Sequence, residues 1–167
     1  MTGRLSIRSV LARRPHACAR IMGSKEYPGI AGTVRFYQTN GGVLVAAEVC
    51  GLPKRAEHGM DGIFAFHIHS GSRCSGNETD PFADALTHYN PQDHPHPYHA
   101  GDMPPLFGNG GYTCQAFFTD RFSVQEIIGR TVIIHSDPDD FTTQPAGNAG
   151  RKIACGQIRA VGGCCRA

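Results

Sequence analysis

A short loop, residues 88–102, carries four side chains of the kinds that bind metal ions. It reads HYNPQDHPHPYHAGD, and its candidate ligands are His88, His96, His99 and Asp102. The loop is rich in proline and nearly empty of aliphatic residues, so it gains little from packing against a core. Zinc takes four nitrogen, sulfur or oxygen ligands, and three imidazoles with one carboxylate match that number. The sequence therefore predicts a metal site here; the alternative is a solvated histidine-rich segment that chelates metal only by accident.

Two predicted strands add further histidines. Residues 64–69 read FAFHIH, and residues i and i+2 of a strand share a face, so His67 and His69 are expected to point the same way. The β-branched run at 131–135 ends in His135, where a strand opens into a loop and functional side chains often lie. Six of the nine histidines lie between residues 67 and 99, which favours a common purpose over isolated surface positions.

These motifs together resemble the copper/zinc superoxide dismutase family. The resemblance rests on the HIH strand, on HYNP with the histidine spacing of the 88–102 loop, on IGRTVIIH at 128–135 and on GNAGRKIACG at 147–156. It extends over residues 17–161, and PHPYHAGDMPPL at 95–106 is similar to the bacterial branch of the family.

The resemblance implies an oxidoreductase that converts superoxide to oxygen and hydrogen peroxide with copper and zinc as cofactors. The implied copper ligands are His67, His69, His88 and His135, and the implied zinc ligands are His88, His96, His99 and Asp102. His88 would thus serve both metals and act as a general acid toward peroxide. Asp139 would accept hydrogen bonds from His67 and His96 and so fix their orientation. A disulfide between Cys74 and Cys155 is also implied, the alternative being two buried thiols.

Two features of the chain depart from the family pattern or complicate it. The position of the family's anion-docking arginine holds Lys152, with Arg151 just before it. Lysine keeps the charge but lacks the planar fork of donors, so we expect activity to survive at a lower rate and Lys152→Arg to raise it. If that variant gained nothing, Arg151 would already fill the role. His94 is an additional histidine in the loop, but Pro95 restricts its geometry, and His96 is the favoured ligand.

Two other functions fit part of the pattern. A copper- and zinc-binding module with little or no turnover would keep every ligand, so the ligands alone do not exclude it. A cupin-type metal enzyme also uses an HxH strand, but it requires a glutamate three or four residues after the second histidine, where Ser72 and Arg73 stand.

Composition favours a single all-β domain. The chain has 167 residues, 21 glycines, 11 prolines and no tryptophan, as is typical of a turn-rich β protein. We expect a Greek-key β-sandwich or flattened eight-stranded barrel with two long functional loops, 70–111 and 136–150. The expected strands are residues 19–22, 32–38, 43–49, 63–69, 112–119, 131–135 and 152–161, with a helical turn or loop at 123–128.

The ends of the chain are expected to lie outside the dismutase-like domain, which spans residues 17–161. Residues 1–16 form a basic, disordered N-terminal tail, for which an organelle-targeting leader is the alternative, and residues 162–167 form a C-terminal tail with exposed thiols. The formal net charge of +2 is too small to indicate nucleic acid binding, and no apolar run is long enough to cross a membrane. No secretory signal is visible, so a cytoplasmic location is expected. The resemblance implies either a homodimer or a monomer, since members of the family occur as both, and the sequence does not choose between them.

Overall fold

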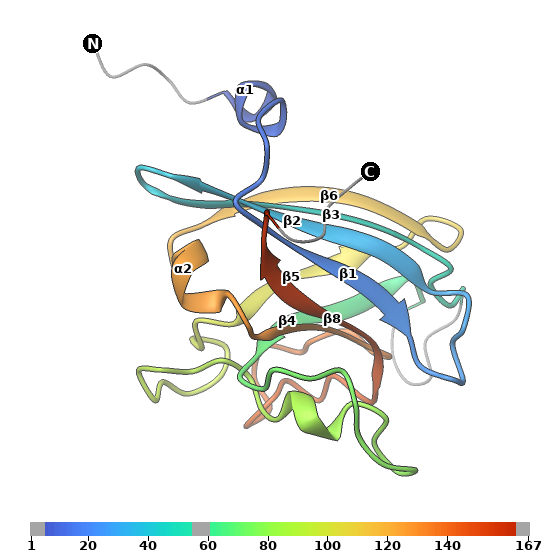
Figure 1. Cartoon of the computed structure of the whole chain (residues 1–167). Helices are drawn as coiled ribbons and strands as arrows, with labels where there is room; N and C mark the ends of the chain where they lie inside the picture. The colour runs from blue at the N-terminus through green and yellow to red at the C-terminus, as the bar shows by residue number, and fades with distance from the viewer. Residues whose placement is uncertain (1–5, 55–60, 163–167) are drawn as a thin grey trace.

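The strands of the chain form one antiparallel sheet that curls into a nearly closed barrel (Figure 1). The structure is a computed structural model that describes residues 6–54 and 61–162. Its strands are β1 Ala17–Gly23, β2 Ala31–Thr39, β3 Gly42–Cys50, β4 Ile63–His69, β5 Asp102–Phe107, β6 Tyr112–Thr119, β7 Thr131–His135 and β8 Lys152–Ala160. Its helices are α1 Ile7–Leu11, α2 Val124–Ile127 and the short 3-10 helix η1 Ala83–Ala85.

The order of strands around the sheet is β5-β4-β7-β8-β1-β2-β3-β6. Strands β1, β2 and β3 pair with their sequence neighbours, after which the chain crosses to the other end of the sheet for β4 and β5 and returns to place β6 beside β3. This crossing confirms the predicted Greek-key barrel. The bounds predicted for β4, β6 and β7 match the structure, and those of β1, β2, β3 and β8 differ by one or two residues.

Strand β5 was not predicted, because residues 70–111 were expected to be a loop. It pairs with β4 from Ile63 opposite Phe107 to His67 opposite Asp102, with a register shift in between. Pro104 and Pro105 occupy that shift and have no N–H to donate, so they obscured the strand signal. They also explain why the described strands show no ladder between β5 and β6. A side-chain hydrogen bond from Gln115 Nε2 to the Pro105 carbonyl at 3.0 Å links the two edges.

The alternation of β4 decides where the barrel core ends and the site begins. Phe64, Phe66 and Ile68 point inward and are fully buried in the main apolar core. His67 and His69 therefore point outward, yet they are also buried, at 0% and 2% exposure. They are covered because the two long loops lie together over that part of the barrel wall, at the end of the molecule away from α1 (Figure 1).

The loop that follows β4 is fastened to the barrel in two ways. A disulfide joins Cys74 to Cys155 on β8, as the family resemblance implied, and closes a segment of 81 residues. In the chain-entropy model such a closure stabilises the fold by about 4 kcal/mol. Phe82 and Ala85, at η1, also pack on Ile133 and Cys155 in a small apolar cluster.

Helix α1 lies within the segment that was expected to be a disordered tail. Val10 is 2% exposed and packs against Tyr37 and Leu44 on the barrel, so the expectation of disorder is wrong for residues 7–11. Residues 1–5 and 163–167, with the expected exposed thiols of Cys164 and Cys165, lie outside the described residues. Within the described part of the chain, no helix has both the length and the apolar character needed to cross a bilayer.

Candidate metal centre

Seven side chains from the barrel wall and the loops form two groups with metal-ligand chemistry. The first group comprises His67, His69, His88 and His135, and the second comprises His88, His96, His99 and Asp102. Within each group the candidate ligand atoms all lie within 4.8 Å of one another, and every member is buried. His88 belongs to both groups. The structure thus brings together the full sets of residues that the sequence predicted, and it leaves His94 outside them.

The hydrogen bonds of the first group turn one nitrogen of each ring inward. His69 Nδ1 lies 2.8 Å from the Leu86 carbonyl, which only accepts, so the proton is on Nδ1 and Nε2 carries a lone pair. His135 Nδ1 lies 3.5 Å from the Gly150 carbonyl, so it too carries the proton and leaves a lone pair on Nε2. The two Nε2 atoms then meet at 3.3 Å with lone pairs on both, which is no hydrogen bond but suits a cation between them.

The second group is centred on Asp102, the first residue of β5. Its carboxylate has Oδ1 at 2.8 Å from His88 Nδ1 and 3.3 Å from His99 Nδ1. His96 Nδ1 lies 3.0 Å from Oδ2, but it is not aligned for a hydrogen bond. Asp102 Oδ2 also accepts the backbone N–H of His99 at 3.1 Å, which fixes the carboxylate in the loop.

Asp139 connects the two groups by hydrogen bonds to one histidine of each, on the side of the ring that faces away from the group. Its Oδ2 accepts from His67 Nε2 at 2.7 Å, and its Oδ1 accepts from His96 Nε2 at 2.8 Å. A carboxylate accepts only, so both protons are on Nε2, and the Nδ1 atoms of the two rings point into their groups with free lone pairs. The backbone N–H of Phe141 adds a third bond to Oδ1 at 2.7 Å. This is the arrangement that the resemblance implied for Asp139.

Three buried ring nitrogens have no hydrogen-bond partner: His67 Nδ1, His88 Nε2 and His96 Nδ1. Buried polar atoms normally find partners, since leaving one unpaired costs about 1–3 kcal/mol. All three atoms face the interior of a ligand group, and one of them is on the ring that the groups share. The residues present therefore fit two adjacent metal ions, with His88 offering one nitrogen to each.

The electrostatics keep the ligands in their metal-binding forms. Burial lowers the pKa of His67 to about 4, against the opposing hydrogen bond to Asp139. Burial also lowers the pKa values of His69 and His135 well below the usual range, so these rings are neutral near pH 7. For Asp102, burial raises the pKa, but the hydrogen bond and charge of His88 outweigh it and bring it to about 2. Neutral imidazoles and an ionised carboxylate are the forms that bind metal.

Several residues that hold the second group in place were not identified from the sequence. Gln144 receives the backbone N–H of His96 at 3.0 Å and donates to its carbonyl at 2.7 Å. Arg121 donates from Nη1 to the carbonyls of Pro97 at 2.8 Å and His99 at 3.3 Å. Gly147 has φ +67°, and a Cβ there would collide with Asp139 and the His96 ring. Gln144 and Arg121 bind backbone groups 22–48 positions away, and Gly147 acts by leaving space for side chains, so no local motif marks these roles.

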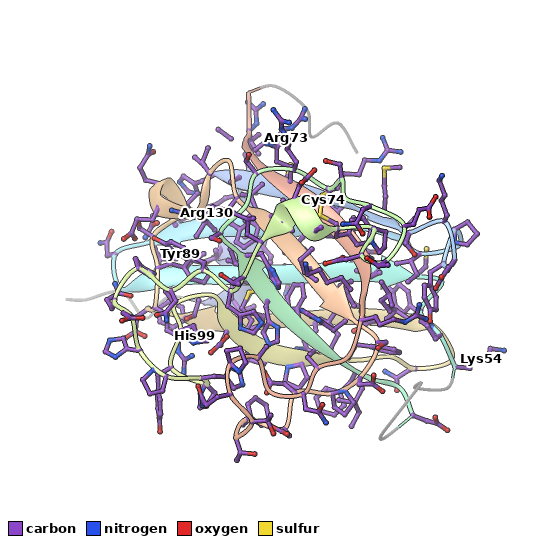
Figure 2. All side chains as sticks on the ribbon, turned by 90° about the horizontal axis from the view of Figure 1, so that it is seen from below. Lys54, Arg73, Cys74, Tyr89, His99 and Arg130 are labelled. Carbon is purple, nitrogen blue, oxygen red and sulfur yellow. A yellow bond between two sulfur atoms is a disulfide. The ribbon has the colours of Figure 1, made fainter. Side chains whose placement is uncertain are left out.

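The base of the 70–101 loop is tied to the start of β7. The guanidinium of Arg130 stacks over the Tyr89 ring at 3.9 Å, and its Nη1 donates to the Ser70 carbonyl at 3.1 Å. Figure 2 views the molecule from the loop side and shows Arg130 beside Tyr89, with Cys74 next to η1. Tyr89 also donates its backbone N–H to the Ile68 carbonyl and accepts the Gly101 N–H, so the segment that bears His88 is held close to β4.

A cavity of about 580 Å³ opens onto the first group. Its lining includes His69, His88 and His135 of the first group, and also both Lys152 and Arg151. Lys152 is held close by: Nζ donates to Asp80 Oδ2 at 2.7 Å and to the Phe82 carbonyl at 3.1 Å. Arg151 instead turns outward, with Nη1 at 2.8 Å from Glu26 Oε2 in an exposed ion pair. A small anion that enters the cavity therefore meets a cation beside three histidines.

Comparison with known proteins gives consistent matches over most of the chain. The sequence model of the family described as copper/zinc superoxide dismutase matches residues 30–158. The copper-zinc superoxide dismutase 2 of Aquifex aeolicus is 37% identical over 145 residues, which cover 78% of this chain and 80% of that protein. The copper-zinc superoxide dismutase of Deinococcus radiodurans is 33% identical over 150 residues, which cover 79% of each chain.

Proposed function

The chain belongs to the copper/zinc superoxide dismutase family, and from this premise we propose which of its residues carry the conversion of superoxide to oxygen and hydrogen peroxide. It is an oxidoreductase with copper and zinc as cofactors and superoxide as substrate. The alternative of a metal-binding module without turnover is not favoured, since the relatives it matches over most of its length are named as dismutases.

We assign the first group of histidines to copper and the second group, with Asp102, to zinc. The first group consists of imidazoles only, which suit both oxidation states of copper, whereas the carboxylate of the second suits zinc. Bound copper supplies the one-electron redox couple, and zinc, which has none, orders the loop. The first group is also the one that lines the cavity, and so the one that a substrate reaches.

His88 and Lys152 are the residues that we propose act on the substrate. The unpaired His88 Nε2 lies at the cavity, where it can hold a proton and pass it to the peroxide that forms. Lys152 offers its ammonium to the incoming anion from the cavity wall. Arg151 contributes positive charge at the mouth of the cavity, where it already binds Glu26. We therefore favour Lys152 over Arg151 as the anion-docking residue.

The observation that carries this assignment is the set of three unpaired, buried ring nitrogens that point into the two groups. A histidine cluster kept for packing would pair these atoms with protein acceptors or donors. Here the outer nitrogens of His67, His69 and His96 are each bound to an acceptor, and the inner nitrogens are left with lone pairs.

Separate removal of the two groups tests the assignment. Purified protein is loaded with copper and zinc, its metal content is measured, and superoxide removal is followed after pulse radiolysis against a free-copper background. We expect one ion of each metal per chain. His135→Ala should lose copper and activity but keep zinc, and Asp102→Ala should lose zinc first. His94→Ala is the matched control, because His94 lies in the same loop and belongs to neither group.

Two outcomes would count against the proposal. If both metals bind but superoxide disappears no faster than with free copper, the chain is a metal-binding module. If His94→Ala reduces metal content as much as His135→Ala does, the ligand sets are wrong. The cytoplasmic location and the homodimer stay predictions, to be tested by cell fractionation and by analytical ultracentrifugation.

A further inference from the structure

The ammonium group of Lys152 is already bound at two of its three N–H donors. It donates to Asp80 Oδ2 at 2.7 Å and to the Phe82 carbonyl at 3.1 Å. An ammonium has three donors, so one remains for an incoming anion. Lys152 has a side-chain exposure of only 15%, and Asp80 one of 37%, so the ammonium group of this pair is largely shielded from water.

Asp80 is not free to move away from the lysine. Its Oδ1 accepts the backbone N–H of Phe82 at 2.9 Å, and its own backbone exchanges bonds with Asn77. Phe82 packs in the apolar cluster with Ile133 and Cys155, and the disulfide at Cys74 fastens the same loop. These contacts hold the carboxylate where it faces Lys152 at the cavity.

The other cation at the cavity provides a contrast. Arg151 pairs with Glu26 at 2.8 Å, but their side-chain exposures are 54% and 64%. Water and salt screen such a pair strongly, and its long side chains can separate at little cost. Two carboxylates thus face the two cations of one cavity, one in a fixed and sheltered pair and the other in an exposed pair.

We propose that Asp80 is a specificity-determining residue for the dismutase reaction: it neutralises most of the charge of Lys152, so that this residue meets the incoming anion as a single, fixed hydrogen-bond donor. The proposal rests on the proposed function, in which Lys152 docks superoxide. Attraction by a free charge favours any small anion, whereas one positioned N–H favours an anion of the right size at the right place. Asp80 therefore limits the binding of competing anions at the cost of long-range attraction.

The test compares three variants of the copper- and zinc-loaded protein with azide as the probe anion. Asp80→Asn keeps an oxygen for the Phe82 N–H but removes the charge. Glu26→Gln removes the same charge from the exposed pair and is the matched control. Asp80→Glu restores the charge. The azide dissociation constant is measured by optical titration, the rate of superoxide removal is measured from low to high ionic strength, and the metal content of each variant is checked.

We expect Asp80→Asn to lower the azide dissociation constant by roughly two- to fivefold, the size expected for one unit charge in a partly solvated pair. Its rate should rise at low ionic strength and fall more steeply with salt. Glu26→Gln should shift the azide constant by less than half as much, and Asp80→Glu should stay near wild type. Equal shifts in the Asp80→Asn and Glu26→Gln variants, or none in either, would overturn the proposal.

Asp80→Ser keeps the test decisive if Asp80→Asn folds poorly, because it removes the same charge and leaves a hydroxyl to accept the Phe82 N–H. This variant should also lower the azide dissociation constant by roughly two- to fivefold. An azide dissociation constant equal to that of the wild type would overturn the proposal. If instead the wild-type protein with both metals bound removes no superoxide, the proposed function fails, and the azide titrations still report on the ion pair alone.

Discussion

Replacing Asp139 by asparagine should weaken copper binding much more than zinc binding. The carboxylate serves three donors: His96 Nε2 and the Phe141 N–H on Oδ1, and His67 Nε2 on Oδ2. An asparagine has one oxygen and one NH2 group. Its oxygen should occupy the Oδ1 position, because there it accepts from both His96 and Phe141, whereas at the Oδ2 position it would accept from His67 alone. The NH2 group then faces the N–H of His67, and two donors oppose each other.

His67 has two ways to respond, and both harm the copper group. If the ring keeps its tautomer, a buried N–H loses its acceptor, at about 1–3 kcal/mol. If the proton moves to Nδ1, the nitrogen that points into the group no longer has a lone pair. Mutating the residue that accepts the N–H of a metal-binding histidine typically weakens metal affinity by about 10–100-fold. We therefore expect the copper dissociation constant to rise by about 10–100-fold and that of zinc by less than about threefold, because the bond to His96 survives.

Competition with chromophoric chelators measures the two affinities separately, and long-range nitrogen–proton NMR of the metal-free protein reads the tautomer of His67. Asp140→Asn is the matched control. Asp140 is the neighbouring carboxylate, is exposed and accepts only from Thr142 and Thr143, which an asparagine can also cap. A loss of zinc affinity as large as the loss of copper affinity would refute the prediction, as would unchanged copper binding with His67 in its original tautomer.

Three further predictions concern stability and the zinc group. Cys74→Ser should lower the free energy of unfolding by about 4 kcal/mol in a denaturant titration, and a wild type as stable after reduction as before would contradict this. Gln144→Ala should weaken zinc binding by about 1–2 kcal/mol in chelator competition, since it removes two bonds to the His96 backbone, while copper affinity should stay constant. The metal-free protein should lose stability on acidification. His67 has a pKa lowered from 6.5 to about 4, so the unfolded chain binds the proton more readily. The contribution is complete above about pH 6.5 and is lost toward pH 4, by about 3 kcal/mol for this ring, and a flat profile of unfolding free energy over that window would refute it.

The sequence predicted those parts of the molecule whose signal is local. Strand β6 alternates along its length, β7 is a run of β-branched residues that ends in a histidine, and the predicted bounds of β4, β6 and β7 match the structure. The candidate histidine ligands could be proposed from the sequence because residue type and spacing are what metal binding requires, and the structure brings these side chains together. Strand β5 was missed because Pro104 and Pro105 suppress the pattern of a strand that pairs on one side only.

Residues whose partners lie far away in the sequence could not be identified from local sequence patterns. Gln144 binds His96 from 48 positions away, and Asp80 binds Lys152 from 72 positions away. Each is an ordinary polar residue in a loop, and only the folded chain gives it a partner. Helix α1 was also missed, since its contact with the barrel depends chiefly on one side chain, Val10.

The open seam between β5 and β6 has a consequence for the protein without its metals. Strand β5 is held by β4 on one side, and its first residue is Asp102, a member of the zinc group. When zinc leaves, the start of this strand loses its anchor, so its amides should exchange with solvent earlier than those of the central strands. A loosened edge can pair with the edge of another chain, and the two prolines limit that pairing because they offer no N–H. A zinc ion held by the second group is therefore expected to protect the β5 edge from self-association.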